Sequence, residues 1–217
     1  MTSPSGPGAL EGVPPPDDGR FLPPPPTLPE IGFETQPRWA VGIDGRAGVG
    51  MLAHSDARGA FAFAGALLRG HYSYFEAGGF YDHADGSAQG GTFSHAGGFV
   101  GAWLPYRNWV DFDAALGIGV RHYADTDARY GTGGYTVNCP ALSLLLGVSD
   151  RARLDDFGLR VGGQLVLTQD FGQKDKQWTA QETNDTGDVV TTNGTTHVGG
   201  FSASLVFTLG FDYGDSP

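Results

Sequence analysis

The sequence lacks several common features, and each absence excludes a class of structure or partner. It contains one cysteine, Cys139, which excludes a disulfide within the chain and a metal site built from thiolates. No run of 18 or more apolar residues occurs, so a membrane-spanning helix is excluded. The 13 Lys and Arg residues stand against 24 Asp and Glu, and the net charge of −11 argues against nucleic acid as a partner. Lysine itself occurs only at Lys174 and Lys176.

The sequence has instead a regular alternation of apolar residues with small or polar ones. From Phe201 to Tyr213 every second residue is apolar, and only Val206 interrupts the small or polar residues between them. A period of two is typical of a β-strand whose two faces lie in different surroundings. Similar stripes run over 110–120, 140–148 and 157–167. Their length of about 9–11 residues suits a tilted strand that crosses a membrane, whereas strands in soluble proteins average about 5–6 residues.

The two faces of these strands differ in charge and size. The apolar faces carry no charge, and the other faces hold Gly, Ala, Ser and Thr with a few charges and no lysine. An Arg or Lys facing lipid at the membrane midplane costs about 2–4 kcal/mol, so the uncharged faces are predicted to contact lipid. Small residues suit the crowded interior of a narrow barrel. The residues assigned to lipid are Val110, Phe112, Leu116, Ile118, Leu142, Leu144, Leu146, Leu159, Leu165, Leu205, Phe207 and Leu209.

Eight strands can be placed between residues 38 and 213. We expect them near 38–51, 58–69, 71–82, 92–104, 108–123, 134–149, 156–171 and 195–213. Their connections alternate between short turns and longer polar loops, except that the first, Ala53–Ala57, is short at the long-loop end. The sequence therefore predicts an all-β fold over 37–217: an eight-stranded antiparallel up-and-down transmembrane β-barrel, with both termini at the short-turn end. The last strand is expected to close the barrel against the strand that begins at Trp39.

Aromatic residues near the short-turn ends of these strands would form an interfacial girdle. They are Trp39, Trp103, Tyr106, Trp109, Phe157 and Tyr213. With these features, the chain over about 38–213 resembles the small eight-stranded outer-membrane barrels of Gram-negative bacteria, the OmpA and OmpX type. The resemblance is one of architecture, and it implies a bacterial outer-membrane location with outer-membrane lipids and the barrel-insertion machinery as partners. It also implies that Phe211 or Tyr213 is the insertion signal, followed here by Gly214–Pro217.

The start of the chain is predicted to lie outside the barrel. Eleven of the 14 prolines fall in 1–37, including Pro14–Pro16 and Pro23–Pro26. Such a stretch cannot join a β-ladder or form a helix, so we expect 1–36 to be a proline-rich, disordered periplasmic tail. Met1–Gly6 shows neither a basic segment nor an apolar core. Because a barrel of this kind must be exported, we infer that its export signal has been removed.

Charged residues on the inward faces are the first candidates for function. They are Asp44, Arg46, Glu76, Asp111, Asp113, Arg121 and Arg160, together with Gln164. Asp111, Asp113 and Arg160 are expected near the same end of the barrel, where they could meet. Buried charges are tolerated when they are paired, so we predict a polar network that closes the lumen. A narrow path for small solutes is the alternative.

Two other functions follow from different interpretations of the same strands. A soluble, lipocalin-like barrel would bind a hydrophobic ligand with its apolar faces turned inward. An outer-membrane lipid-modifying hydrolase would need a nucleophile beside a histidine and an acid. Ser94 and His95 are adjacent on a predicted strand, but neighbours on a strand point to opposite faces. The histidines show no metal-binding spacing, so we predict no enzyme, no metal and no cofactor.

The longest loop, 172–194, has strand character of its own. We interpret it as a hairpin extension with strands Gln177–Thr183 and Val189–Thr195 around an Asn184–Asp188 turn. A protruding hairpin exposes its backbone edges, and exposed edges can pair with another chain. This loop is therefore the predicted binding site for a cell-surface partner, in a protein with a structural, adhesive or surface-interaction role.

Overall fold

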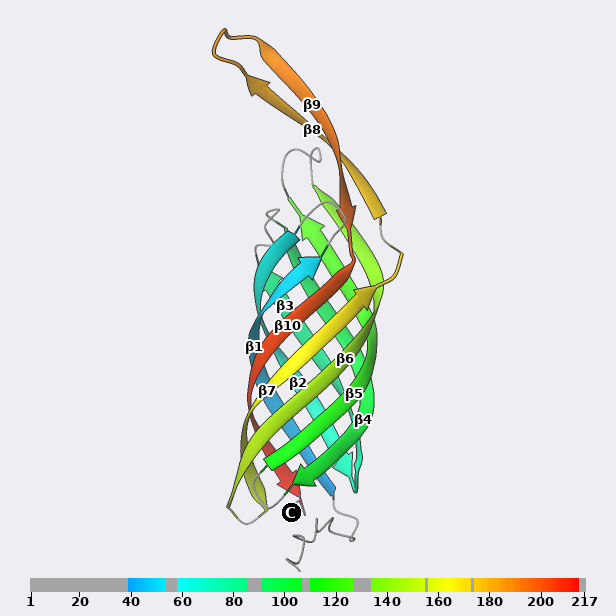
Figure 1. The fold of residues 1–217 in the computed structure, drawn as a ribbon, viewed down its shortest axis with the longest axis vertical. Helices are drawn as coiled ribbons and strands as arrows, with labels where there is room; N and C mark the ends of the chain where they lie inside the picture. The colour runs from blue at the N-terminus through cyan, green and yellow to red at the C-terminus, as the bar shows by residue number, and fades with distance from the viewer. Residues whose placement is uncertain are drawn as a thin grey trace, which may run out of the picture. The chain divides into compact units, whose positions relative to one another are not determined.

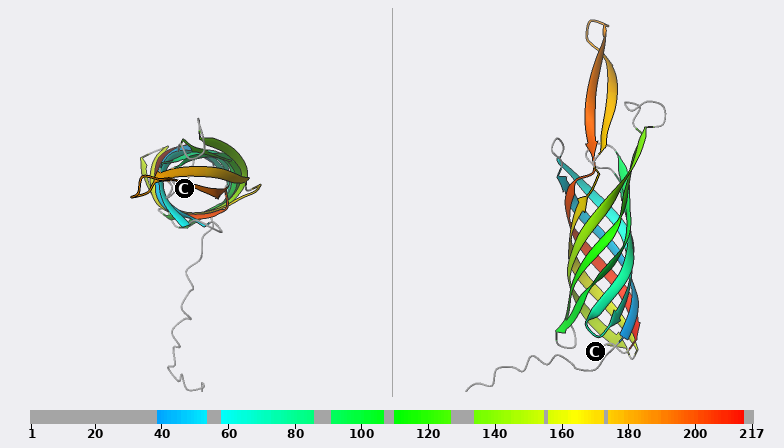
Figure 2. Two further views of the ribbon diagram at one scale, coloured as in Figure 1. Left: turned by 90° about the horizontal axis from the view of Figure 1, so that it is seen from above. Right: turned by 90° about the vertical axis from the view of Figure 1, so that its right-hand side faces the viewer.

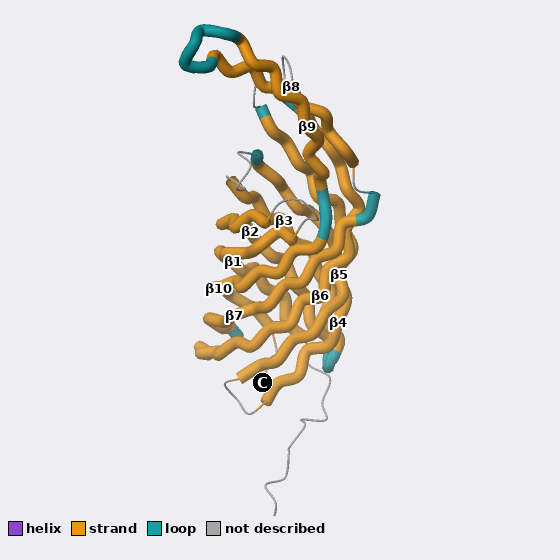
Figure 3. The backbone as a smooth tube through the Cα atoms, turned by 45° about the horizontal axis from the view of Figure 1, so that its top comes forward, coloured by secondary structure: helices purple, strands orange, loops and turns teal. Residues whose placement is uncertain are grey.

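The computed structural model describes residues 39–53, 58–85, 91–106, 110–126, 134–154, 156–172 and 174–214. The proline-rich stretch 1–36 lies outside the described residues, so its disorder stays a prediction. The described residues are built almost entirely of strands and the turns that join them (Figure 3). Among them, no helix is long and apolar enough to cross a membrane.

Eight strands form one closed antiparallel barrel, in the order β1-β10-β7-β6-β5-β4-β3-β2 (Figure 1). This arrangement confirms the predicted eight-stranded up-and-down barrel. Two further strands pair with each other in a separate two-stranded sheet. The bounds are β1 Trp39–Ala53, β2 Arg58–Tyr72, β3 Phe75–Asp85, β4 Thr92–Tyr106, β5 Val110–Asp125, β6 Tyr135–Leu154, β7 Phe157–Asp170, β8 Lys174–Thr183, β9 Val189–Val198 and β10 Phe201–Gly214.

The last strand closes the barrel, as predicted. β10 pairs with β7 on one side and with β1 on the other, where Tyr213 lies opposite Val41 and Phe207 opposite Ala47. Viewed from above, the strands of the barrel enclose a single interior (Figure 2). Closure gives each of these eight strands a paired neighbour on both sides along most of its length, which is what a strand needs where no water can satisfy its backbone.

Predicted strand limits are wrong in three places, one of them the end of β6, which was expected at 149 and lies at Leu154. The turn between β2 and β3 was expected at Arg69–Gly70, but it lies at Ser73–Tyr74, where Ser73 has a left-handed φ of 56°. β2 continues past Arg69 because its guanidinium is buried beside carboxylates inside the barrel. The expected strand 195–213 is interrupted at Gly199 and Gly200, whose φ values of 96° and 141° end β9 before β10 begins.

Burial alternates along the strands with the predicted period. In β10 every second residue from Ser202 is buried and the residues between them face outward. Among the residues assigned to lipid, Val110, Leu144 and Leu165 are half-buried and the other nine are exposed on the outer face. Their contact with lipid stays a prediction, and their place on the outside agrees with it.

The inward-facing side chains are less uniformly small than the sequence suggests. Five phenylalanines point inward and are buried: Phe61, Phe63, Phe80, Phe93 and Phe99. They fit because glycines on neighbouring strands leave room for their rings. A Cβ added at Gly78 would come within 2.7 Å of the Phe99 ring, and one added at Gly48 within 2.8 Å of the Phe63 ring.

Four of the six residues predicted for the aromatic girdle lie exposed, and their contact with the membrane interface stays a prediction. Trp39, Tyr106, Phe157 and Tyr213 are exposed at the short-turn end, and the Tyr213 ring lies 5.9 Å from that of Trp39 and 5.2 Å from that of Phe157. Trp103 is only 2% exposed and lies inside the barrel, so its assignment to the girdle is wrong. Its ring packs 4.6 Å from His71 and 5.1 Å from the Arg151 guanidinium carbon. Trp109 lies outside the described residues.

Candidate functional site

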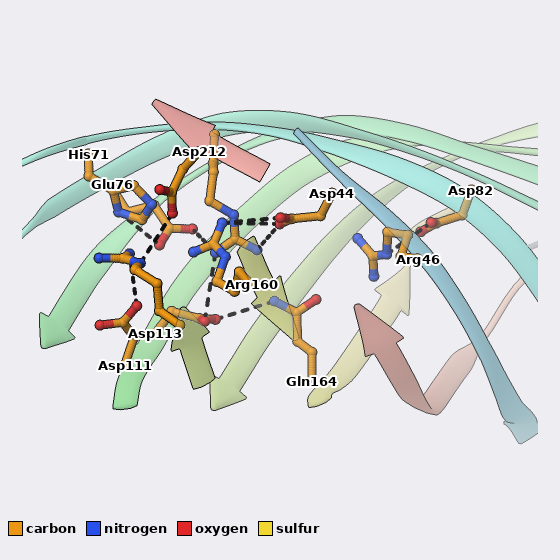
Figure 4. Close-up of polar contacts among 12 residues, drawn as sticks. Asp44, Arg46, His71, Glu76, Asp82, Asp111, Asp113, Arg160, Gln164 and Asp212 are labelled. Atoms are coloured by element: carbon orange, nitrogen blue, oxygen red, sulfur yellow. Dashed lines mark hydrogen bonds and ion pairs between the residues drawn. The ribbon is translucent and has the colours of Figure 1, made fainter. Parts of the chain in front are cut away.

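The lumen contains a cluster of ion pairs near the short-turn end, in which Asp44 pairs with two arginines (Figure 4). The Asp44 carboxylate accepts hydrogen bonds from Arg69 on β2 and from Arg160 on β7, the latter at 3.2 and 3.3 Å. Arg69 also lies 3.6 Å from a Glu76 oxygen and 3.8 Å from an Asp113 oxygen. All of these side chains are almost fully buried, so each charge depends on its partners rather than on water.

Arg151 extends this short-turn cluster to the remaining strands. Its Nη2 lies 2.8 Å from Asp111 and its Nε 3.2 Å from Asp212. Gln164 donates to Asp113 at 3.3 Å, and His71 lies 3.6 Å from Glu76. With Trp103 from β4, the cluster takes at least one side chain from each of the eight barrel strands. These contacts therefore link all eight strands of the barrel from the inside, near its short-turn end.

A second group in the lumen is a single ion pair that lies among the phenylalanine rings. Arg46 Nε is 3.1 Å from an Asp82 oxygen, and the guanidinium carbon is 5.9 Å from the centroids of both Phe63 and Phe80. A cavity of about 20 Å³ adjoins this pair and is lined by both charged residues, with His95 and Arg121 among its other walls. That volume holds about one water molecule.

A third group, the mouth cluster, ties the end of β7 to the start of β10. Asp170 Oδ2 accepts hydrogen bonds from Tyr123 at 2.5 Å, Arg121 at 3.4 Å and the backbone N–H of Gly200 at 3.2 Å. The Asp170 N–H in turn donates to the Gly200 carbonyl at 2.9 Å. Arg121 also donates to Ser202 at 3.0 Å.

The base of the β8–β9 hairpin packs beside this mouth cluster. Val198 is buried in the same apolar cluster as Cys139, whose side chain is 0% exposed. A Cβ added at Gly199 would come within 3.2 Å of the Cys139 sulfur. The lone cysteine therefore lies directly beneath the chain that leads from the hairpin into β10.

The eight predicted lumen residues all lie inside the barrel, but they fall into three groups. Asp44, Glu76, Asp111, Asp113, Arg160 and Gln164 are in the short-turn cluster, Arg46 is beside Asp82, and Arg121 is in the mouth cluster. The expected meeting of Arg160 with Asp111 and Asp113 is replaced by other pairs. Arg160 contacts Asp44, whereas Asp111 contacts Arg151.

Six buried charges were missed by the sequence reasoning: Arg69, Asp82, Asp125, Arg151, Asp170 and Asp212. Arg69 and Arg151 fell in segments interpreted as turns, and Asp82 and Asp170 fell at strand ends. Asp212 has the same parity as the polar residues of β10, so the alternation alone could have placed it inside.

The predicted hairpin is confirmed and is longer than expected. β8 and β9 pair from Lys174 opposite Val198 to Thr183 opposite Val189, so the ladder extends three residues closer to the barrel. The Asn184 side-chain oxygen accepts hydrogen bonds from the N–H groups of Thr186 and Asp188 at 3.1 and 2.8 Å, which fixes the turn. Across the ladder, Thr179 donates to Asn193 at 2.7 Å, and the Trp178 ring covers Gly194.

The candidate catalytic and metal-binding residues do not come together in one site. Ser94 is half-buried on the side of β4 opposite to His95, which is buried in the lumen against the Phe80 ring. Two exposed histidines have separate partners, Asp85 for His83 and Asn138 for His122. Within the part of the chain that the structure describes, no group of three His, Cys, Asp or Glu side chains could hold a metal ion.

Comparisons with known proteins bear on the fold. No protein-family model matches the chain, and no curated protein matches it in sequence. The solved structure of Neisserial surface protein A is similar with a TM-score of 0.53 at 10% identity, covering 80% of this chain and 97% of that one. Ail of Yersinia pestis is similar with a TM-score of 0.44 at 11% identity, covering 82% and 99%. Its closed barrel and its likeness to Neisserial surface protein A give the chain the fold of the small eight-stranded outer-membrane β-barrels.

Proposed function

We propose that this protein is a non-conducting barrel of the bacterial outer membrane whose β8–β9 hairpin binds a partner at the cell surface. The apolar outer face of the barrel and its likeness to outer-membrane barrels support the location. Outer-membrane lipids and the barrel-insertion machinery are its partners in this account, with Phe211 or Tyr213 as the insertion signal.

The filled lumen is the observation that carries the non-conducting role. Among the described residues, eight buried carboxylates and five buried arginines lie inside the barrel, and the rings of five phenylalanines are packed with them. The short-turn cluster reaches all eight strands, and the space beside Arg46 and Asp82 holds only about one water molecule. A hydrated solute would have to separate several buried ion pairs to pass.

The hairpin supports the surface-binding role. It is the one sheet in the described residues that is not part of the barrel wall, and both of its strands are largely exposed. Its ladder and its turn are held by its own hydrogen bonds, so it is ordered before a partner binds. A preformed strand edge can add a strand from a partner at low entropic cost.

Deleting residues 177–195 and joining Lys176 to Thr196 through a short Asn-Gly turn should abolish surface binding and leave the barrel intact. Lys176 and Thr196 lie opposite each other in the ladder, so the shortened hairpin can close there. Cell adhesion is the measurement, and the shift in gel migration between boiled and unboiled samples reports that the barrel has folded. Adhesion equal to that of the intact protein would contradict the proposed role of the hairpin.

A further inference from the structure

The side chains of β8 from Lys176 to Glu182 form complementary pairs about Thr179. Moving outward from Thr179, Trp178 is matched by Ala180, Gln177 by Gln181, and Lys176 by Glu182. One of the chain's two lysines thus occupies the position that mirrors a carboxylate. Lys176, Trp178, Ala180 and Glu182 share one face of the strand, and Gln177, Thr179 and Gln181 share the other.

An antiparallel copy of the same strand would satisfy every one of these positions. If two β8 strands align with their Thr179 residues opposite each other, Lys176 of each faces Glu182 of the other. The two glutamines meet as amide pairs, and the bulky Trp178 faces the small Ala180. Opposite charges and hydroxyl pairs directly across a ladder stabilise it, whereas like charges there destabilise it. A parallel alignment would instead place Lys176 beside Lys176 and Glu182 beside Glu182.

The backbone edge of β8 is open to such a copy. In the described residues β8 pairs only with β9, on one side. Lys174, Gln177, Thr179, Gln181, Glu182 and Thr183 are exposed along this strand. The tip at Asp185 and Asp188 is acidic and also exposed, while Lys174 and Lys176 lie at the opposite end of β8 with Asp175 between them, which pairs with His197. Antiparallel pairing therefore brings each acidic tip toward the lysines of the other hairpin. Such an attraction is needed because two copies of a chain with a net charge of −11 otherwise repel each other.

We propose that the partner of the hairpin is a second copy of this chain, joined through antiparallel β8 strands centred on Thr179. The contact is isologous, because the same strand is used on both sides of a twofold axis. The inference rests on the proposed surface-binding role of the hairpin and names its partner.

A cysteine at the predicted axis tests the pairing directly. In proteoliposomes of the full chain carrying Cys139→Ser, Thr179→Cys should form a disulfide-linked dimer under mild oxidation, because residues directly opposite in a ladder lie within disulfide range. Thr191→Cys, on the same face of the hairpin but on β9, is the matched control and should stay monomeric. Absence of a dimer at Thr179→Cys, or equal dimer at both positions, would overturn the proposal.

Exchanging the charges tests the register. In the Thr179→Cys background, Lys176→Glu should reduce the dimer several-fold because the introduced carboxylate then faces that of Glu182 in the other copy. Glu182→Lys should do the same, and the double exchange K176E/E182K should restore the dimer. Equal dimer yields in the single and double charge variants would overturn the proposed register. If the dimer fails while deletion of 177–195 still abolishes adhesion, the hairpin binds a different partner. If the dimer forms while the deletion leaves adhesion unchanged, the hairpin pairs two copies of this chain but does not mediate adhesion.

Discussion

Replacing Asp44 with alanine should lower the free energy of unfolding of the barrel by about 3–5 kcal/mol, the cost of leaving buried charges without their partner. Asp44 is fully buried and neutralises two guanidinium groups, those of Arg69 and Arg160, that come from different strands. The measurement is a denaturant titration in lipid vesicles, read by the difference in gel migration between folded and unfolded chain.

Asp150 provides the matched control for this experiment. It is an aspartate of β6 on the exposed side of the strand, so Asp150→Ala should change the stability by less than about 0.5 kcal/mol. A double variant, D44A with R160A, should lose less stability than the two single variants added together, because the second change removes a charge that the first has left unpaired. Additive losses would show that the Asp44–Arg160 pair contributes little.

Replacing Asp170 with alanine should expose Cys139 to reagents in water, at a rate raised by about tenfold or more. The change removes the acceptor for Tyr123, Arg121 and the Gly200 N–H, which together hold the hairpin base against the barrel mouth. Each 1.4 kcal/mol lost from the closed state is a factor of about ten in the open population, and an unpaired buried arginine costs more than that. The measurement is the rate at which a water-soluble maleimide modifies Cys139 in folded proteoliposomes.

Asp111→Ala separates this local opening from a general loss of stability. Asp111 pairs with Arg151 at 2.8 Å in the short-turn cluster, ten residues along β5 from Arg121. Its loss should destabilise the barrel without raising the rate of Cys139 modification. If Asp111→Ala and Asp170→Ala raise the rate equally, Asp170 does not hold the mouth closed.

The sequence was sufficient for those parts of the fold that depend on local alternation. The period of two in β10 predicted which residues face outward, and the Asn184–Asp188 segment predicted the turn of the hairpin. Both features arise from neighbours in the chain, so their pattern is visible without a structure. The alternation was ambiguous in β2, where Ala and Phe share the strand, and the inward Phe61 and Phe63 were missed there.

The pairing of charges could not be predicted because it depends on the tilt of the strands and on residues far apart in sequence. Asp44 and Arg160 are 116 residues apart, and Asp170 and Gly200 meet only because the hairpin returns to its starting point. Arg151 fell in the short connection expected between the strands 134–149 and 156–171, yet β6 continues to Leu154 and its Arg151 pairs with Asp111. The burial of Arg151 beside Asp111 thus decided where the strand ends, and the local sequence did not show it.

The conductance of the purified protein in a planar lipid bilayer tests the closed lumen most directly. With three groups of paired charges and a layer of phenylalanine rings across the interior, the intact barrel should show no steady openings. Asp44→Ala, in which Arg69 and Arg160 lose the carboxylate between them, should show openings more often than the intact protein. Steady channels of one defined size in the intact protein would contradict the account, because the filled lumen would then be a path for solutes.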